Sequence, residues 1–370
     1  MTPVSSPSSV LEGRFQSLDF FRGLTMFLLI AEFTELFEHL VGPALEGTWI
    51  YHFGMQFHHH PWSGLRFWDL IQPFFMFIVG VAIPFAIGNR QKKGETKTQI
   101  RNHVLQRSLL LLLIGWGLYC MGPGHIVFKF QNVLAQLSVT YLLAYLIMEK
   151  PAKVQLIISF ALIALSDIIY RTFPVEGFNH PFVANENFGT WLDLQYGGAD
   201  MGGHWVSFNA IPTTAHTIWG VLAGQLLRKE RSSAQKLKIL LIAGAIGLVA
   251  GYALHPIIPI IKRICTSSFV LVSGGWTVLV LALSYWLIDI KKWNLGVWFF
   301  SVVGMNSLFI YLFAHVGGSR MIERMVVPFT TSLLGWMGEA ATAIITSLIV
   351  LSLLWYLCYW LYKKRIFFKI

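Results

Sequence analysis

A run of three histidines, residues 58–60, lies shortly before a single aspartate, Asp69, at the start of a long apolar stretch. Pro61 and the Trp62-Ser63-Gly64 sequence after it predict a turn, which places the histidines in a loop. A carboxylate that accepts a hydrogen bond from one imidazole nitrogen leaves the other nitrogen oriented as a base. The stretch therefore predicts acid–base chemistry by one of these histidines together with Asp69.

Two other interpretations of the histidine run stay open at this point. Histidines in a loop at a membrane surface are often simply solvated. Three histidines could also bind zinc, but adjacent residues project in different directions and form a poor set of ligands. We therefore expect no metal ion at this site.

The first long apolar stretch, "SLDFFRGLTMFLLIAEFTELFEHL", carries ionisable residues that are unusual in such a segment. Asp19 and Arg22 stand near its start, where they could form an ion pair at the membrane interface. Glu32 lies about 15 Å further along a helix. A charged group at that depth is costly unless it is paired or hydrated, so Glu32 is predicted to face a functional cavity.

A late segment, "GMNSLFIYLFAHV", places Asn306 inside an apolar stretch and His315 near its end. Nine residues separate them, about two and a half helical turns, so the two side chains do not share one helix face. Asn306 could stabilise a developing oxyanion, or it could form a hydrogen bond to a neighbouring helix.

The composition indicates a polytopic membrane protein. Of the 370 residues, 55% are hydrophobic and only 12% are charged, whereas a soluble domain carries about a quarter charged residues. The apolar residues occur in stretches long enough to cross a bilayer as helices. The net charge of +10 comes from basic residues in the connectors between these stretches, which favours membrane orientation over binding to nucleic acid.

The sequence predicts an all-α bundle of about ten transmembrane helices over residues 18–362, between a tail at 1–17 and a basic tail at 363–370. The predicted spans are Leu18–Leu40, Phe67–Ile87, Ser108–Gly122, Val133–Met148, Val154–Phe173, Ala210–Leu227, Ile239–Leu254, Ser267–Ile288, Val297–Val316 and Ala340–Tyr362. Lysine and arginine concentrate in alternate connectors, most densely after the second span. Both termini are therefore expected in the cytoplasm.

With this orientation, every histidine except His103 falls in an outer connector or toward the outer end of a span. The longest outer connector, residues 174–209, carries acidic residues including Asp193 and no lysine or arginine. These features predict proton transfer on a polar and possibly cationic substrate that approaches from outside. On the inner side, Arg22, Arg107 and the basic connectors offer cations for phosphate groups.

Several segments together resemble one enzyme family. They are "SLDFFRGLTM", "HHPWSGLRFWDLIQPFFMFIVGVAI", "NAIPTTAHTIWGVLAG", "IKRICTSSFVL" with "LALSYWLID", and "GMNSLFIYLFAHV". In this order they resemble the heparan-α-glucosaminide N-acetyltransferase family, which belongs to a wider group of transmembrane acyltransferases. The resemblance covers nearly all of the chain.

The resemblance implies that an acetyl group passes from cytoplasmic acetyl-CoA to the amino group of a terminal glucosamine on the opposite side. It assigns the essential histidine to His59, three residues before Trp62, and its acidic partner to Asp69. It also matches Asn306 and His315 to the late family motif. Acetyl-CoA would then be bound near Asp19, Arg22 and Arg107, and the acceptor sugar near Trp62, Glu32, His315 and Asp193.

One position departs from the family, because Phe33 stands where asparagine is usual. Either Glu32 takes over the polar role, or the acceptor differs. Transfer to a sugar hydroxyl and proton-coupled transport of a sugar are the alternatives to N-acetylation. We expect His59 to act as a general base in a ternary complex, with a transient acetyl-histidine as the other route.

The chain resembles the compact bacterial form of the family. That form implies an integral protein of the bacterial inner membrane, with its histidine-rich face outward. The family also implies a homodimer as an assembly, although no feature of this sequence demands one.

Overall fold

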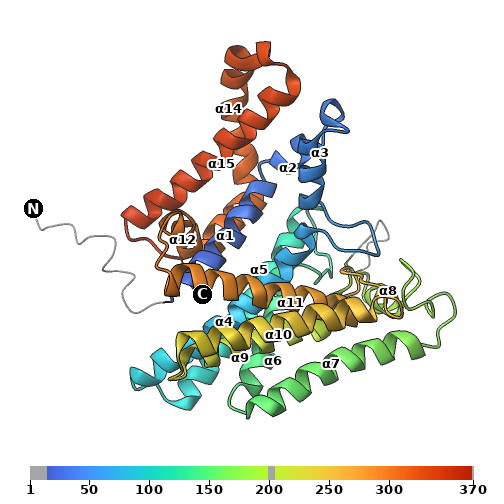
Figure 1. Ribbon diagram of the computed structural model, residues 1–370. Coiled ribbons are helices and arrows are strands. Elements are labelled where there is room, and N and C mark those ends of the chain that lie inside the picture. The colour runs from blue at the N-terminus through green and yellow to red at the C-terminus, as the bar shows by residue number, and fades with distance from the viewer. Residues whose placement is uncertain (1–14, 199–204, 369–370) are drawn as a thin grey trace, which may run out of the picture.

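The chain folds almost entirely into helices (Figure 1). The computed structural model describes residues 15–198 and 205–368, so most of the predicted tail at 1–17 and the end of the tail at 363–370 lie outside the described residues. The helices are α1 (Gln16–Glu32), α2 (Leu36–Leu40), α3 (Trp49–Gly54), α4 (Ile71–Lys92), α5 (Lys97–Met121), α6 (Val133–Ile147), α7 (Ala152–Thr172), α8 (Phe188–Gln195), α9 (Ala210–Arg228), α10 (Ser233–Leu254), α11 (Ser267–Ser284), α12 (Val297–Met305), α13 (Ser307–Phe313), α14 (Ser319–Leu334) and α15 (Glu339–Lys363).

Among the described residues, six helices are long and apolar enough to cross a membrane, and a bent pair adds a seventh. The six are α4 with the short turn before it, α5, α7, α10, α11 with the turn after it, and α15. Helices α1, α6 and α9 coincide with predicted spans but fall outside this set. The prediction of an all-helical membrane bundle is confirmed at this level. The number of ten spans and the orientation of the termini stay predictions.

The predicted span Leu18–Leu40 is two helices rather than one. Glu35 adopts a left-handed conformation with φ of 59°, which ends α1 and begins α2 in a new direction. The break leaves backbone carbonyls of the α1 end without helical partners. Ser319 donates a hydrogen bond to the Phe33 carbonyl, and Ser347 donates one to the Thr34 carbonyl at 2.7 Å. These hydroxyls make a broken helix tolerable inside an apolar bundle.

The predicted span Val297–Val316 is also broken, at Asn306. The chain bends by 72° between α12 and the helical segment Ser307–Met337. That segment contains α14, a helix that the sequence analysis did not predict because its apolar residues alternate with Arg320, Glu323 and Arg324. In Figure 1, α14 and the adjoining end of α15 stand out from the rest of the bundle.

Burial distinguishes the central helices from the peripheral ones. In the apolar part of α4, 67% of the residues are buried, against 17% in α10. Helix α4 therefore lies in the core, where it packs against α9 and α1. Helix α10 packs mainly along α11 and presents most of its apolar surface outward, as a helix facing lipid does.

Small residues allow α4 and α9 to approach closely. A Cβ atom built at Gly220 would lie 2.2 Å from the carbonyl oxygen of Phe77, and one at Gly80 would lie 2.1 Å from the carbonyl oxygen of Thr217. Both obstacles are backbone atoms, so neither can move without separating the helices. This contact fixes α4, and α4 leads directly from the Asp69 region to the opposite end of the bundle.

Substitution of Gly220 by alanine is expected to destabilise the protein by about 1–3 kcal/mol, because the added methyl group overpacks the contact of α4 and α9. Gly117→Ala is the matched control, since Gly117 is also inside a helix but has nothing within 4 Å of the added carbon. Thermal unfolding in detergent should show a lower Tm for Gly220→Ala and an unchanged or higher Tm for Gly117→Ala. Equal Tm values for the two variants would contradict this packing.

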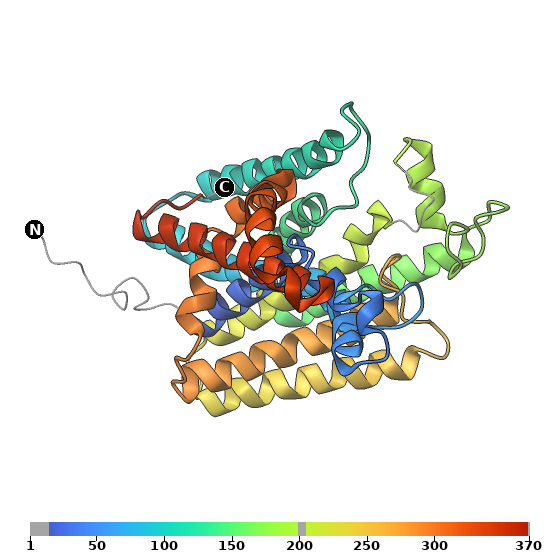
Figure 2. The same cartoon turned by 90° about the horizontal axis from the view of Figure 1, so that it is seen from above.

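The loops separate into two groups at opposite ends of the bundle (Figure 2). The C-terminal segment and the connection from α11 to α12 lie at one end. Helix α3 and the segment between α7 and α8 lie at the other. Because α4 starts near Asp69 and finishes in the basic connector before α5, the histidine loop and that basic connector lie at different ends.

Candidate active site

The histidine loop and the start of the second apolar stretch form a hydrogen-bonded pair. His59 donates a hydrogen bond from Nδ1 to Oδ1 of Asp69 at 3.0 Å. The side chain of Asp69 is 1% exposed, whereas that of His59 is 32% exposed. A buried carboxylate thus fixes one face of the imidazole, and Nε2 is left as the ring nitrogen that can act as a base. The predicted pair of His59 and Asp69 is present.

Backbone groups of the same loop hold the second oxygen of Asp69. Its Oδ2 accepts hydrogen bonds from the backbone N–H of Arg66 at 2.9 Å and of His60 at 3.3 Å. The Arg66 guanidinium in turn donates to the His59 carbonyl oxygen at 3.1 Å. The loop therefore wraps around the carboxylate, which keeps the imidazole in a fixed orientation.

A second loop, between α10 and α11, packs against the histidine loop. Gly64 donates a backbone hydrogen bond to the Ile260 carbonyl at 2.8 Å, and Ser63 pairs with Ile261 as an isolated β-bridge. This pairing places Lys262 in the site, with its Nζ 3.1 Å from Nδ1 of His59 and 3.8 Å from Oδ1 of Asp69. The two residues are 203 positions apart in the sequence.

Trp205 covers this group from the side. Its ring lies edge-on to the His59 ring, with 4.9 Å between centroids. The Lys262 ammonium lies 4.6 Å from the centre of the same indole, and the Arg263 guanidinium lies 5.8 Å from it. The indole therefore contacts the imidazole edge-on and the two cations through cation–π geometry.

Electrostatics keep His59 uncharged at neutral pH. Burial away from water, followed by the Lys262 ammonium, lowers the pKa of His59 to about 4, against the opposing effect of Asp69. Burial also lowers the pKa of Lys262 to about 8, while Asp69 and Glu32 oppose that shift. At pH 7 the site thus holds a neutral imidazole beside a cationic amine.

Glu32, the last residue of α1, is linked to this group through Trp68. Trp68, which is 2% exposed, donates from Nε1 to Oε1 of Glu32 at 3.0 Å. Because Trp68 directly precedes Asp69, the α1 carboxylate lies beside the His59–Asp69 pair. The polar side chain beside Trp68 thus comes from position 32 of α1, and position 33 holds an apolar phenylalanine. Phe33 packs instead against Tyr311 and His315, at ring distances of 6.2 and 5.5 Å.

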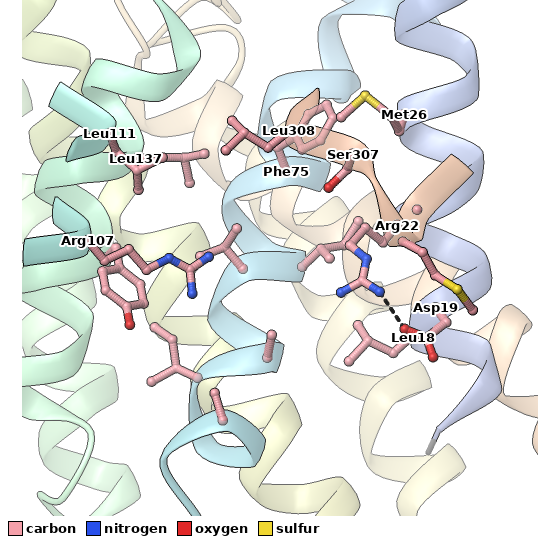
Figure 3. A pocket seen from close by; sticks show the side chains of 18 of the residues that line it. Leu18, Asp19, Arg22, Met26, Phe75, Arg107, Leu111, Leu137, Ser307 and Leu308 are labelled. Carbon is pink, nitrogen blue, oxygen red and sulfur yellow. Dashed lines mark hydrogen bonds and ion pairs between the residues drawn. The ribbon is translucent and has the colours of Figure 1, made fainter. Parts of the chain in front are cut away.

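A large cavity lies along α1 and α4 and includes their ends far from Asp69 (Figure 3). It has a volume of about 840 Å³. Three residues predicted to bind a phosphorylated co-substrate line it, namely Asp19, Arg22 and Arg107, and Arg90 and His103 line it as well. Figure 3 shows Arg22 and Arg107 reaching toward the cavity from opposite walls.

Each of these two arginines lines the cavity and has a partner for its own guanidinium group. Arg22 forms an ion pair with Asp19 at 2.6 Å, and Arg107 lies 4.9 Å above the ring of Tyr141. Within the described parts of the chain, Nε of both Arg22 and Arg107 is buried and has no hydrogen-bond partner. Two guanidinium groups that reach into one cavity from opposite walls favour binding of a phosphate group.

The rest of this cavity is apolar and extends along the helices. Its lining on α4 runs from Arg90 to Phe75, roughly 22 Å by helical rise, and its lining on α1 runs from Leu18 to Leu29. Glu32 is the next position on that face of α1, one turn beyond Leu29. The cavity therefore extends from the arginines toward Glu32, which is hydrogen-bonded to Trp68, the residue before Asp69.

Asn306 and His315 make their described contacts in other parts of the bundle. Asn306 is fully buried at the break between α12 and α13, where its amide donates to the Ile366 carbonyl at 3.0 Å and accepts from the Phe368 N–H at 3.1 Å. It thus anchors the C-terminal segment beside the cavity-lining Met305 and Ser307. His315 is stacked on Tyr311 at 5.5 Å. The catalytic role of Asn306 and the substrate-binding role of His315 stay predictions.

Trp62 and Asp193 hold the loops around the site. Trp62 donates from Nε1 to the Phe182 carbonyl at 2.7 Å. Asp193 is fully buried and accepts hydrogen bonds from Gln131 and from the hydroxyl groups of Tyr196 and Ser207. Since Ser207 lies two residues after Trp205, Asp193 positions the segment that carries the indole. Direct binding of a substrate by either residue stays a prediction.

Sequence reasoning did not assign Lys262 or Trp205 to the site. Lys262 stands in "IKRICTSSFVL", a segment that carries the family resemblance, but the sequence assigns no specific role to this lysine. A basic residue flanked by apolar positions just before a span was the available signal. Among the residues that the structure describes, no three His, Cys, Asp or Glu side chains are grouped as ligands for a metal ion.

Comparison with known proteins gives a consistent assignment. Residues 14–255 match the family described as heparan-alpha-glucosaminide N-acetyltransferase, catalytic. The chain is 25% identical to the human heparan-alpha-glucosaminide N-acetyltransferase, over 100% of this chain and 62% of that protein. It is also 25% identical to the mouse protein of that name, over 96% of this chain and 60% of that protein.

The chain thus spans about 60% of the length of these curated relatives. The matched region contains the His59–Asp69 pair, Glu32 and the arginines of the cavity. The match covers well over half of the 370 residues. The chain belongs to the heparan-alpha-glucosaminide N-acetyltransferase catalytic family.

Proposed function

We propose that this protein transfers an acetyl group from acetyl-CoA, bound from the cytoplasmic side, to the amino group of a glucosamine-type sugar on the outer side of a membrane. One observation carries the proposal most directly. The arginines predicted to bind the co-substrate line a single cavity, and that cavity extends along α1 and α4 toward the His59–Asp69 pair.

The shape and charge of the cavity suit acetyl-CoA. The phosphate groups would lie near Arg22, Arg90 and Arg107, where guanidinium groups can form charge-assisted hydrogen bonds. The long and thin pantetheine arm would follow the apolar lining past Leu29 and Phe75. The charged part of the co-substrate then stays at one end, and only the thioester advances toward Glu32 and His59.

His59 is placed to act on the acceptor. A neutral sugar amine attacks the thioester carbonyl carbon, so that a C–N bond forms and the carbonyl oxygen gains negative charge. Nε2 of His59 takes the proton that the new C–N group releases. The C–S bond then breaks, and the CoA thiolate takes the proton from His59 as it leaves, which restores the neutral imidazole. Asp69 keeps the imidazole oriented throughout, as the acid of a catalytic triad does.

A direct assay separates this function from its alternatives. Purified protein in detergent is mixed with acetyl-labelled acetyl-CoA and either glucosamine or N-acetylglucosamine, and label on the sugar is measured. Transfer to glucosamine alone supports N-acetylation, because N-acetylglucosamine has no free amine. Transfer to both sugars supports O-acetylation. Movement of sugar across a sealed vesicle without consumption of acetyl-CoA would instead support transport and contradict the proposal.

A further inference from the structure

Lys262 is an unusual side chain for its position. It is 6% exposed, although lysine is almost never buried unless it is paired. Its Nζ lies 3.1 Å from Nδ1 of His59, 3.8 Å from Oδ1 of Asp69 and 4.6 Å from the centre of the Trp205 ring. The chain thus places a second titratable group directly against the proposed base.

The hydrogen-bond pattern restricts where protons can be. The carboxylate of Asp69 can only accept, so the short contact to His59 requires a proton on Nδ1. The Lys262 ammonium has only donors, so it cannot accept a hydrogen bond from the N–H at Nδ1 of His59. A second proton on Nε2 would therefore create an imidazolium whose Nδ1 lies 3.1 Å from the buried Lys262 ammonium, too close for water to stand between the two charges.

We propose that Lys262 is a positioning residue of the active site, whose positive charge keeps His59 neutral in the resting protein and favours release of the proton that Nε2 takes up during the reaction. The catalytic part of this statement rests on the proposed function. The part about the protonation of His59 does not, because it concerns only the resting protein.

The other charges around His59 act on its pKa in both directions. Asp69, at the start of the second apolar stretch, raises the pKa of His59, and Arg263, in the loop before α11, lowers it. Glu32, on α1, acts on Lys262 and helps to keep the amine protonated. Because the pKa of Lys262 is lowered only to about 8, the ammonium form is present at every pH below that value.

The test compares three variants of the full-length protein in detergent. Lys262→Met removes the charge but keeps an unbranched side chain, and Lys262→Arg keeps the charge. Lys153→Met removes an equal charge from an exposed position at the start of α7. Each protein is treated with diethyl pyrocarbonate, which modifies neutral histidine, and tandem mass spectrometry measures modification at His59 as a function of pH.

We expect the wild-type rate at His59 to stay flat from pH 8 down to pH 5, because the pKa of His59 is about 4. In Lys262→Met, no ammonium opposes the effect of Asp69 on the pKa of His59. The pH midpoint of His59 modification should therefore rise by about 1.5 pH units. The rate at pH 5 should then fall about fourfold below the rate at pH 8. Lys262→Arg and Lys153→Met should behave like the wild-type protein.

The acid limb of the pH–rate profile for acetyl transfer gives a second readout. It should move upward by the same amount in Lys262→Met and not in Lys262→Arg. A modification midpoint in Lys262→Met equal to that of the wild-type protein overturns the proposal, even if activity falls at every pH. A shifted midpoint without acetyl transfer by any variant supports the role of Lys262 and refutes the proposed function. If Lys262→Met does not fold, Lys262→Gln, which keeps a polar head group, replaces it with the same expected midpoint.

Discussion

Replacement of His59 by alanine is expected to lower kcat for acetyl transfer by roughly 10²–10⁴-fold, which is the usual contribution of a general acid–base group. The KM for acetyl-CoA should change little, because the arginines that would bind its phosphates line a cavity near the opposite ends of α1 and α4. Initial rates with labelled acetyl-CoA and glucosamine, measured on correctly inserted purified protein, provide the check.

The neighbouring histidine supplies the control. His58 donates a hydrogen bond from Nε2 to the Phe37 carbonyl oxygen at 3.1 Å, and its Nδ1 faces Glu38 rather than Asp69. His58→Ala should therefore keep kcat within a few-fold of the wild-type value. If the two alanine variants lose activity equally, the histidine run acts as a structural unit and His59 has no special role.

Substitution of Arg22 or Arg107 by glutamine is expected to raise the KM for acetyl-CoA by about tenfold or more in each case. Loss of one charge-assisted hydrogen bond to a phosphate accounts for an effect of this size, about 1.5–3 kcal/mol. Because neither residue contacts the His59–Asp69 pair, kcat at saturating acetyl-CoA should stay near the wild-type value. Steady-state kinetics with acetyl-CoA as the varied substrate measures both quantities.

A truncated donor tests whether the arginines act through phosphate. S-acetyl-pantetheine carries the thioester and the arm without the phosphate groups of CoA. Its KM should be high in the wild-type protein and nearly unchanged by Arg22→Gln or Arg107→Gln. Arg171→Gln is the matched control, because Arg171 pairs with Asp167 on α7 away from the cavity. A large effect of the Arg22 or Arg107 substitution on S-acetyl-pantetheine would show that the arginines support the fold instead.

The sequence was most informative where the physical signal is local. Apolar stretches predicted helices at nearly all the right places, because a helix is specified by neighbours within a few turns. The pair of His59 and Asp69 was also predictable, since both belong to one loop and the start of one span. The arginines of the cavity were chosen from their expected position at the cytoplasmic ends of helices, and Arg22 and Arg107 do line one cavity.

Features that depend on distant segments were not predictable in this way. The break at Glu35 is tolerated because Ser319 and Ser347 satisfy freed carbonyls from residues about 300 positions away. The approach of Lys262 to His59 depends on pairing of two loops through Gly64 and Ile260. A periodic pattern contains no information about such contacts, so Lys262 looked like any other basic residue of a loop.

The central claim is that a thioester carried by CoA reaches position 59 through the bundle from the side of the arginines. Bromoacetyl-CoA tests it, because a thiol at the end of that path displaces bromide and keeps the CoA group attached. The reagent is applied to sealed vesicles of the His59→Cys variant, from the cytoplasmic side or from the outer side, and the intact protein mass is measured. His180→Cys, in the segment between α7 and α8 at the end of the bundle that carries α3, and the wild-type protein with its native cysteines are the controls.

We predict addition of one CoA group to the His59→Cys variant from the cytoplasmic side, competed by acetyl-CoA and weakened by Arg22→Gln. Neither control protein should be modified from that side. Modification of the His59→Cys variant only when the reagent is outside, or no modification under conditions where the protein binds CoA, would contradict the account.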